Sequence, residues 1–187
     1  SNESDMITAS WNDFSYTDRS FMHQNTNLVG SSDSKVEDDD KLSITFAFNS
    51  WGAKCRARMP MARYGRFHML NNYFHCAGNS TACINPRKNS EFLIEGNYFE
   101  KGVKKIFTQQ DATSVIWTDD NVTVEAFSKP ISFGECYIPY SYTKIPTEIV
   151  KDDVKTFAGS TIWGSTKYSV ISEEEVTGMK CVSDNHS

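Results

Sequence analysis

The sequence predicts an all-β protein of the right-handed parallel β-helix class, a solenoid with about five recognisable coils. The first observation behind this prediction is a repeat at residues 7–14, 44–51, 67–74, 92–99 and 115–122. Each segment is an alternating apolar stretch followed by a carboxamide or acid, with an aromatic residue or valine two positions later. Alternation and a high content of β-branched or aromatic residues indicate β-strands.

The second observation is the spacing of the carboxamide or acid, which recurs at intervals of 37, 23, 25 and 23 residues. A period in the low twenties is too short for a unit of strand, helix and parallel strand. It is typical of a solenoid whose coils contain a few short strands and turns. A leucine-rich repeat has a similar period, but its leucine pattern is missing from this chain.

The third observation concerns the residue types at the repeated positions. Asparagine tolerates the left-handed backbone of a sharp corner and hydrogen-bonds neighbouring backbone groups. Stacked coils would align these residues as a ladder and the aromatic residues as a stack beside it. We assign structural roles to both sets: the ladder of Asn12, Asn49, Asn72 and Asn97, with Asp120 in the fifth position, and the stack of Phe14, Trp51, Phe74 and Phe99.

The longer first interval predicts an insertion at residues 17–41 that loops out on one face of the solenoid. The insertion contains a run of acidic residues at positions 37–40. Such a run could bind a hard cation, but it is more often a solvated turn, and we interpret it as a turn.

The middle of the chain is basic, although the 187 residues together have a net charge of -5. From Lys54 to Lys105 there are ten basic and three acidic residues, a net charge of +7. Guanidinium groups bind carboxylates in fork geometry, so an arginine array on one face would suit a polycarboxylate polymer. The alternative is a cluster of surface arginines that face different directions and have no common partner.

The densest part of this basic region lies at residues 54–66, where Arg58 and Arg63 flank Pro60. In an ideal strand these two arginines would point to opposite faces, because they are five positions apart. Proline lacks an N–H and tends to interrupt a sheet ladder. A bulge near Pro60 would therefore bring both guanidinium groups to one face.

Length and composition favour one domain over residues 1–187, with a loop-rich C-terminal region at about 127–187 that packs on the solenoid. Within that region, residues 146–157 have weak helical character, and we expect them to cover the C-terminal end of the solenoid. No run of about 18 apolar residues is present, so we expect nothing in the chain to span a membrane. We expect neither a membrane nor a nucleic acid as partner. The five cysteines contain no CxxC, and Cys76 and Cys83 could close a short loop in an oxidising compartment.

The segment Arg58-Met-Pro60-Met-Ala-Arg63-Tyr-Gly65 resembles the RxPxxRxG signature of the pectate lyase family, polysaccharide lyase family 1. Three further stretches are similar to family segments: the turn at residues 28–33, the coil at 92–100 and the Pro-Tyr-Ser-Tyr-Thr segment at 139–143. The resemblance covers roughly residues 4–159, and the family fold is the parallel β-helix that the repeat predicts.

The resemblance implies cleavage of polygalacturonate by calcium-assisted β-elimination, which leaves C4–C5 unsaturated oligogalacturonides. Arg58 matches the family's base, which removes the C5 proton next to the uronate carboxylate. Arg63 matches the arginine that binds a substrate carboxylate, and Arg87 matches a substrate-contacting arginine of some members. For Arg87 an ordinary turn arginine remains an alternative. Because such polymers lie outside cells, the expected location is secreted, extracellular or periplasmic.

Two departures from the family pattern leave room for an alternative, a catalytically inactive homologue that binds polyuronate. The family's substrate-binding lysine is replaced by Asn25, and neither His23 nor Arg19 aligns with it. The family's calcium ligands fall on coils before Ser1, so we assign no metal ligand in this chain. We therefore expect a longer native protein or a second polypeptide that supplies the N-terminal coils. A polygalacturonase is disfavoured because the basic region lacks suitably placed paired carboxylates.

Overall fold

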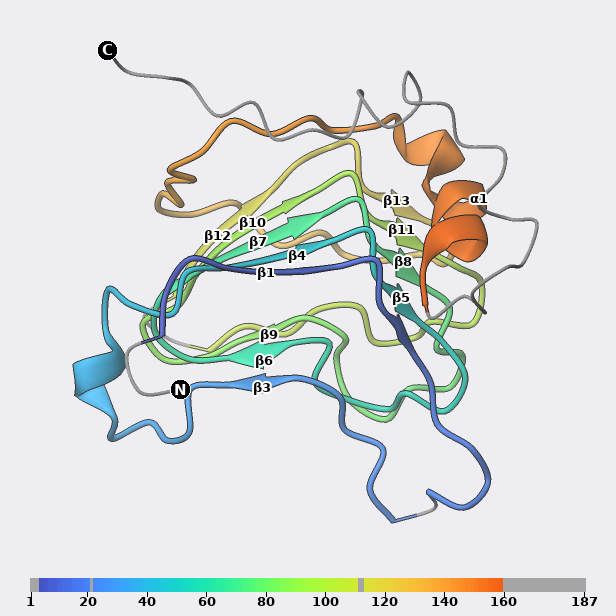
Figure 1. Cartoon of the computed structure of the whole chain (residues 1–187), viewed down its shortest axis with the longest axis horizontal. Coiled ribbons are helices and arrows are strands. Elements are labelled where there is room, and N and C mark those ends of the chain that lie inside the picture. The colour runs from blue at the N-terminus through green and yellow to red at the C-terminus, as the bar shows by residue number, and fades with distance from the viewer. Residues whose placement is uncertain (1–3, 21, 111–112, 160–187) are drawn as a thin grey trace, which may run out of the picture.

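The computed structural model describes residues 4–20, 22–110 and 113–159 as a parallel β-helix with three sheets (Figure 1). In the first sheet the strand order is β1 (Ile7–Ser10), β4 (Ile44–Ala47), β7 (Arg66–Leu70), β10 (Glu91–Glu95) and β12 (Ser114–Trp117). In the second it is β13 (Val122–Thr123), β11 (Tyr98–Phe99), β8 (Tyr73–Phe74), β5 (Ser50–Trp51) and β2 (Asp13–Phe14). In the third it is β3 (Leu28–Val29), β6 (Met61–Ala62) and β9 (Asn85–Pro86).

All strand pairs within these sheets are parallel, so the predicted β-helix is confirmed. The number of coils differs from the expectation. Two sheets have five strands, but the third has only three, so about three turns are complete. The described part of the chain contains no helix that is long and apolar enough to cross a membrane.

The predicted asparagine ladder lies at the corner between the first and second sheets. The carboxamide oxygen of each rung accepts a hydrogen bond from the backbone N–H of the rung one coil earlier, over N···O distances of 2.9–3.0 Å. In the interior of the ladder these side chains are fully buried. The rungs are Asn12, Asn49, Asn72, Asn97 and Asn121.

The fifth rung is therefore Asn121, and the prediction of Asp120 is wrong by one residue. Strand β12 pairs Trp117 with Ile94, so the turn before Asn121 has three residues where the turn before Asn97 has two. The additional residue lets Asp120 accept a hydrogen bond from the backbone N–H of Gly96 at 3.1 Å instead. Sequence alternation cannot detect a one-residue change in turn length.

The predicted aromatic stack fills the interior beside the ladder. Successive rings lie face to face, with centroids 5.4 Å apart for Phe14 and Trp51, 4.8 Å for Trp51 and Phe74, and 4.5 Å for Phe74 and Phe99. Trp117 continues the stack above Phe99 at 5.9 Å. Each such pair contributes about 0.5–1.5 kcal/mol beyond the burial of its area.

The insertion at residues 17–41 only partly loops out, because β3 lies within it and pairs with β6. A short 3-10 helix, η1 (Val36–Asp38), follows β3. In the acidic run, Glu37 pairs with Lys35 at 2.8 Å and Asp40 pairs with Arg66 at 3.0 Å. The run therefore carries local ion pairs at the surface.

The single α-helix of the described residues, α1 (Thr147–Phe157), packs on the side of the solenoid rather than across its end (Figure 1). It contacts β8 and β11, and Val150 and Val154 are completely buried against the cluster that contains Phe48, Leu70 and Tyr73. The helix itself is confirmed, but its expected position at the C-terminal end is wrong. The face with Val150 and Val154 finds its apolar partners at the corner between the first two sheets.

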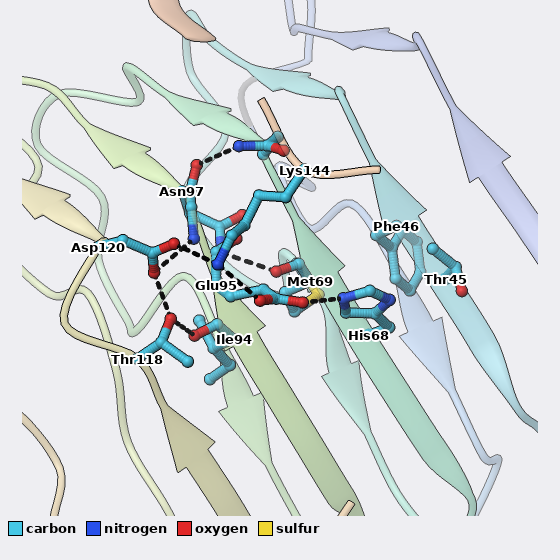
Figure 2. A network of polar contacts seen from close by, with 12 residues as sticks. Thr45, Phe46, His68, Met69, Ile94, Glu95, Asn97, Thr118, Asp120 and Lys144 are labelled. Carbon is cyan, nitrogen blue, oxygen red and sulfur yellow. Dashed lines mark hydrogen bonds and ion pairs between the residues drawn. The ribbon is translucent and has the colours of Figure 1, made fainter. Parts of the chain in front are cut away.

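The segment before α1 lies over the outer face of the first sheet and is held there by a buried polar network (Figure 2). Glu95 is the centre of the network: its carboxylate accepts hydrogen bonds from His68 Nε2 at 2.8 Å and Lys144 Nζ at 3.0 Å. Lys144 also pairs with Asp120 at 2.6 Å. Next to it, the Asn71 carboxamide makes two 3.0 Å hydrogen bonds with the backbone of Ile145.

The network holds Glu95 in its charged form. Burial raises the pKa of this carboxyl group, but hydrogen bonds from His68, Tyr142 and Lys144 outweigh burial and lower the pKa to about 2. The folded-state pKa thus lies below the usual value, so the ionised group stabilises the fold at neutral pH. That contribution is lost as the pH falls from about 4.5 toward about 2.

We predict that Asn72→Ala lowers the free energy of unfolding by about 3–5 kcal/mol, because Asn72 joins three coils. Its carboxamide accepts from Asn49 and donates to Phe46 O at 2.8 Å and to Asn97 Oδ1 at 2.9 Å. Urea unfolding followed by circular dichroism measures the loss. Asn12→Ala is the matched control at the exposed edge of the ladder, and it should lose about 1 kcal/mol or less. Equal losses in the two variants would contradict the role of the buried rungs.

We predict that Glu95→Gln lowers the free energy of unfolding at pH 7 by about 2–3 kcal/mol, because the variant loses the ionised partner of His68 and Lys144. The difference from the wild type should shrink as the pH falls toward about 2, where the wild-type carboxylate also takes up a proton. Thermal unfolding over a series of pH values measures this convergence. Glu148→Gln, an exposed position in α1, is the control. A difference independent of pH would refute the electrostatic explanation.

Candidate functional site

The candidate site lies on the outer face of the third sheet and on the loop that leads into β6. Strand register pairs Val29 with Ala62, and Ala62 with Pro86. The next position on each coil is therefore Gly30, Arg63 and Arg87 in one row. Backbone hydrogen bonds continue into this row, from Arg63 N to Val29 O at 3.1 Å and from Arg87 N to Ala62 O at 2.8 Å. Arg63 and Arg87 are thus neighbours on adjacent coils.

The expected break in alternation around Pro60 is present. Met59 and Ala62 both belong to the hydrophobic core, although they are three positions apart and regular alternation would put them on opposite faces. Arg58 directly precedes Met59, and Arg63 directly follows Ala62. Because neighbouring side chains point to opposite faces, both arginine side chains point away from the core. Arg58 also has a left-handed backbone, with φ of 62°.

The two arginines of the row share one carboxylate, that of Asp33. The Nε of Arg63 donates to Asp33 Oδ1, and Nη2 of Arg87 donates to Asp33 Oδ2 at 3.2 Å. These two hydrogen bonds, the one from Arg63 first, lower the pKa of Asp33, so its carboxyl group stays ionised. Asp33 thereby neutralises part of the charge of the row and fixes the spacing of the two guanidinium groups.

A glycine brings the Asp33 turn against Arg63. Gly30 has a φ of 74°, and a Cβ atom at this position would lie 2.8 Å from the Arg63 carbonyl oxygen. The close approach lets Arg63 Nη1 donate to the Gly30 carbonyl at 3.0 Å. In the sequence this turn stands out only as a family-like segment, and no local pattern indicates that Asp33 pairs with the two arginines.

Arg58 differs from the other arginines of the basic region, whose guanidinium groups all form side-chain hydrogen bonds. Among the residues that the structure describes, none forms a hydrogen bond or ion pair with its guanidinium group, which is partly exposed. By contrast, Lys54 pairs with Asp18, and Arg56 Nε donates to Gln24 Oε1 at 2.7 Å. The predicted patch therefore contains one unpaired arginine and one pair of arginines bridged by a carboxylate.

The coil before Arg58 carries Asn25 at the position of the family's lysine. Asn25 forms a parallel β-bridge with Ala57, and the Arg58 carbonyl accepts a hydrogen bond from Asn27 N at 2.7 Å. Position 25 is thus adjacent to the Arg58 loop. His23 and Arg19 are both exposed.

Two buried polar atoms on β9 and directly after it have no hydrogen-bond partner, Asn85 Oδ1 and Arg87 Nε. An unsatisfied acceptor and an unsatisfied donor two positions apart are costly unless a ligand or water completes them. Metal binding has no comparable basis: the described residues contain no group of three or more His, Cys, Asp or Glu side chains that could hold a metal ion.

Comparison with known proteins finds similar proteins whose names describe them as pectate lyases. A probable pectate lyase A from Aspergillus fumigatus is 31% identical over 141 residues, covering 75% of this chain and 42% of that protein. A pectate trisaccharide-lyase from Bacillus licheniformis is 32% identical over 162 residues, covering 84% of this chain and 43% of that protein. The chain thus spans less than half the length of these relatives.

The solved structure of pectate lyase II from Xanthomonas campestris has the same fold, with a TM-score of 0.56 over 84% of this chain and 50% of that one, at 24% identity. A family model described as pectate lyase matches residues 1–162. With the β-helix and the sequence relatives in agreement, the chain belongs to the pectate lyase family.

Proposed function

We propose that this protein is a polysaccharide lyase that cleaves polygalacturonate by β-elimination, with Arg58 as the base. The observation that carries the proposal is the contrast between an unpaired arginine and a pair of arginines bridged by Asp33 on the same outer face. A base needs a side chain that no carboxylate holds in its protonated form. Substrate binding needs cations in fixed positions.

In the proposed reaction Arg58, in its neutral form, takes the proton from C5 of a galacturonate unit. The electron pair of the C5–H bond forms the C4–C5 double bond, and the C4–O bond breaks. The departing oxygen takes up a proton, so the products are one unsaturated and one ordinary chain end. Because arginine loses its proton only at strongly alkaline pH, we expect an alkaline optimum.

Arg63 and Arg87 are proposed to bind uronate carboxylates. A guanidinium group donates N–H hydrogen bonds to carboxylates, and Nη2 of Arg63 and Nη1 of Arg87 have no hydrogen-bond partner among the described residues. Asp33 would keep both arginines charged and oriented before the polymer binds.

The family resemblance implies calcium, but the described residues do not offer a group of ligands for it. We propose that calcium ligands, where the reaction uses them, come from outside the described residues, and no step above depends on the ion. Secretion is proposed on the substrate alone, because polygalacturonate lies outside cells.

We predict that Arg58→Ala lowers kcat on polygalacturonate at alkaline pH by about 10²–10⁴-fold, the usual contribution of a positioned base. The near-ultraviolet absorbance of the C4–C5 double bond measures the rate, with added calcium and with chelator in parallel. Lys101→Ala, an exposed residue in the turn after β11, is the control and should retain the wild-type rate.

The same assay separates the proposed lyase from the alternative, an inactive polyuronate-binding homologue. Binding of oligogalacturonate without any rise in absorbance, persisting after the N-terminal coils are restored, would support the homologue and reject the lyase. A rise that persists in Arg58→Ala would support a lyase with a different base.

We predict that Arg63→Ala raises KM for polygalacturonate by about 10–100-fold, because a charge-assisted hydrogen bond contributes about 1.5–3 kcal/mol. Arg63→Lys keeps the charge but loses the two parallel donors, so it should restore only part of the affinity. Steady-state kinetics over a series of substrate concentrations measure both variants. A loss confined to kcat, with KM unchanged, would argue against a binding role.

A further inference from the structure

The loop at residues 76–83 connects β8 to β9 one coil after the Arg58 loop. The two loops are joined through backbone hydrogen bonds. Ser80 N and Thr81 N donate to the Arg56 carbonyl at 3.0 and 3.2 Å, and Met59 N donates to the Cys83 carbonyl at 2.7 Å. The backbone of the loop at 76–83 is therefore hydrogen-bonded to the residues on either side of Arg58, and its conformation affects the position of the Arg58 turn.

The loop begins and ends with cysteines whose sulfur atoms are in contact. Cys76 Sγ and Cys83 Sγ lie 3.6 Å apart, and both residues are completely buried in the hydrophobic core. No backbone rearrangement is needed to bring the two sulfur atoms together, because they already face each other.

Asn79 closes the same loop from within. Its Nδ2 donates to the carbonyls of Thr81 and Lys105, both at 2.7 Å, and its Oδ1 accepts from Lys104 N at 3.1 Å. Although Asn79 lies in a glycosylation sequon, its side chain is buried and occupied by these contacts. The loop is thus preorganised in the geometry that presents Cys76 to Cys83.

A third buried thiol, Cys55, is differently engaged. Its Sγ donates to the Phe14 carbonyl at 3.2 Å, which belongs to the preceding coil. Sulfur contact therefore selects Cys76 and Cys83 from the three core thiols as one pair and leaves Cys55 as a thiol.

We propose that Cys76 and Cys83 form a disulfide bond in the folded protein. The bond closes a loop between residues seven positions apart and locks the support of the Arg58 turn. The oxidant is a small or protein disulfide of the class of oxidised glutathione. The thiolate of one cysteine attacks the oxidant, releasing one thiol, and the thiolate of the second cysteine displaces the other half as a second thiol. Two electrons and two protons pass to the oxidant.

Burial determines when this bond can form. It raises the pKa of the Cys83 thiol well above its usual value, so few thiolates exist once the coil is closed. Oxidation therefore belongs to an early stage of folding, before the loop is covered. In the folded protein the same burial keeps reductants away from the bond.

The test is disulfide mapping of the full chain after refolding in a buffer of oxidised and reduced glutathione. Free thiols are alkylated in denaturant without reduction, and the digest is analysed by mass spectrometry. We expect a linked peptide pair containing Cys76 and Cys83, with Cys55 alkylated. Alkylation of both Cys76 and Cys83, or a link from either one to Cys55, would overturn the proposal.

A second measurement tests the effect of the bond without reference to enzymatic activity. Wild type refolded in dithiothreitol should have a Tm about 5–10 °C below that of wild type refolded in the glutathione buffer, as expected for a short closed loop in a chain of this size. Cys55→Ser should respond in the same way, whereas Cys76→Ala/Cys83→Ala should not respond. If the double variant does not fold, mapping of the wild type still decides the outcome. A Tm unaffected by reductant in a cross-linked wild type would refute the stabilising role.

Discussion

The hydrogen bond from the backbone N–H of one asparagine to the carboxamide oxygen of the asparagine on the next coil is the interaction on which the rest of the structure depends. Each interior rung satisfies buried N–H groups at a corner where the sheet ladders cannot reach. Its directionality fixes how far each coil advances, so the aromatic rings stack in the interior and the strands pair in register. The three interior rungs, Asn49, Asn72 and Asn97, are wholly buried. A change of register would therefore leave buried polar groups without hydrogen-bond partners, which is strongly unfavourable.

The same registration creates the candidate site on the opposite side of the coil. Two arginines separated by a whole turn of the chain become neighbours, because β6 and β9 pair position by position. A short turn then places Asp33 between them, where its carboxylate accepts a hydrogen bond from each arginine. Paired guanidinium groups remain charged and oriented, whereas Arg58, without a carboxylate partner among the described residues, is the chemically distinct member.

The remaining surfaces of the solenoid are stabilised by different means. On the first sheet, the segment before α1 covers His68 and Glu95, and the pairing with Lys144 compensates for burial of charge. Beneath the Arg58 loop, the proposed Cys76–Cys83 bond would provide a covalent constraint where the coil has only short strands. A rigid support is consistent with the demand that a proton-transferring side chain be held in one place.

The sequence by itself determined the β-helix, the first four rungs of the ladder and the aromatic stack, because these follow from local alternation repeated at a regular interval. It also predicted a short helix at residues 146–157. Only the tertiary structure decided that Asn121 is the fifth rung, since the turn before it is one residue longer, and that α1 packs on the side of the solenoid. The pairing of Asp33 with Arg63 and Arg87, and of Glu95 with His68 and Lys144, also appeared only in the folded chain. These partners are 27–54 residues apart, and no local pattern encodes a contact that arises when coils stack.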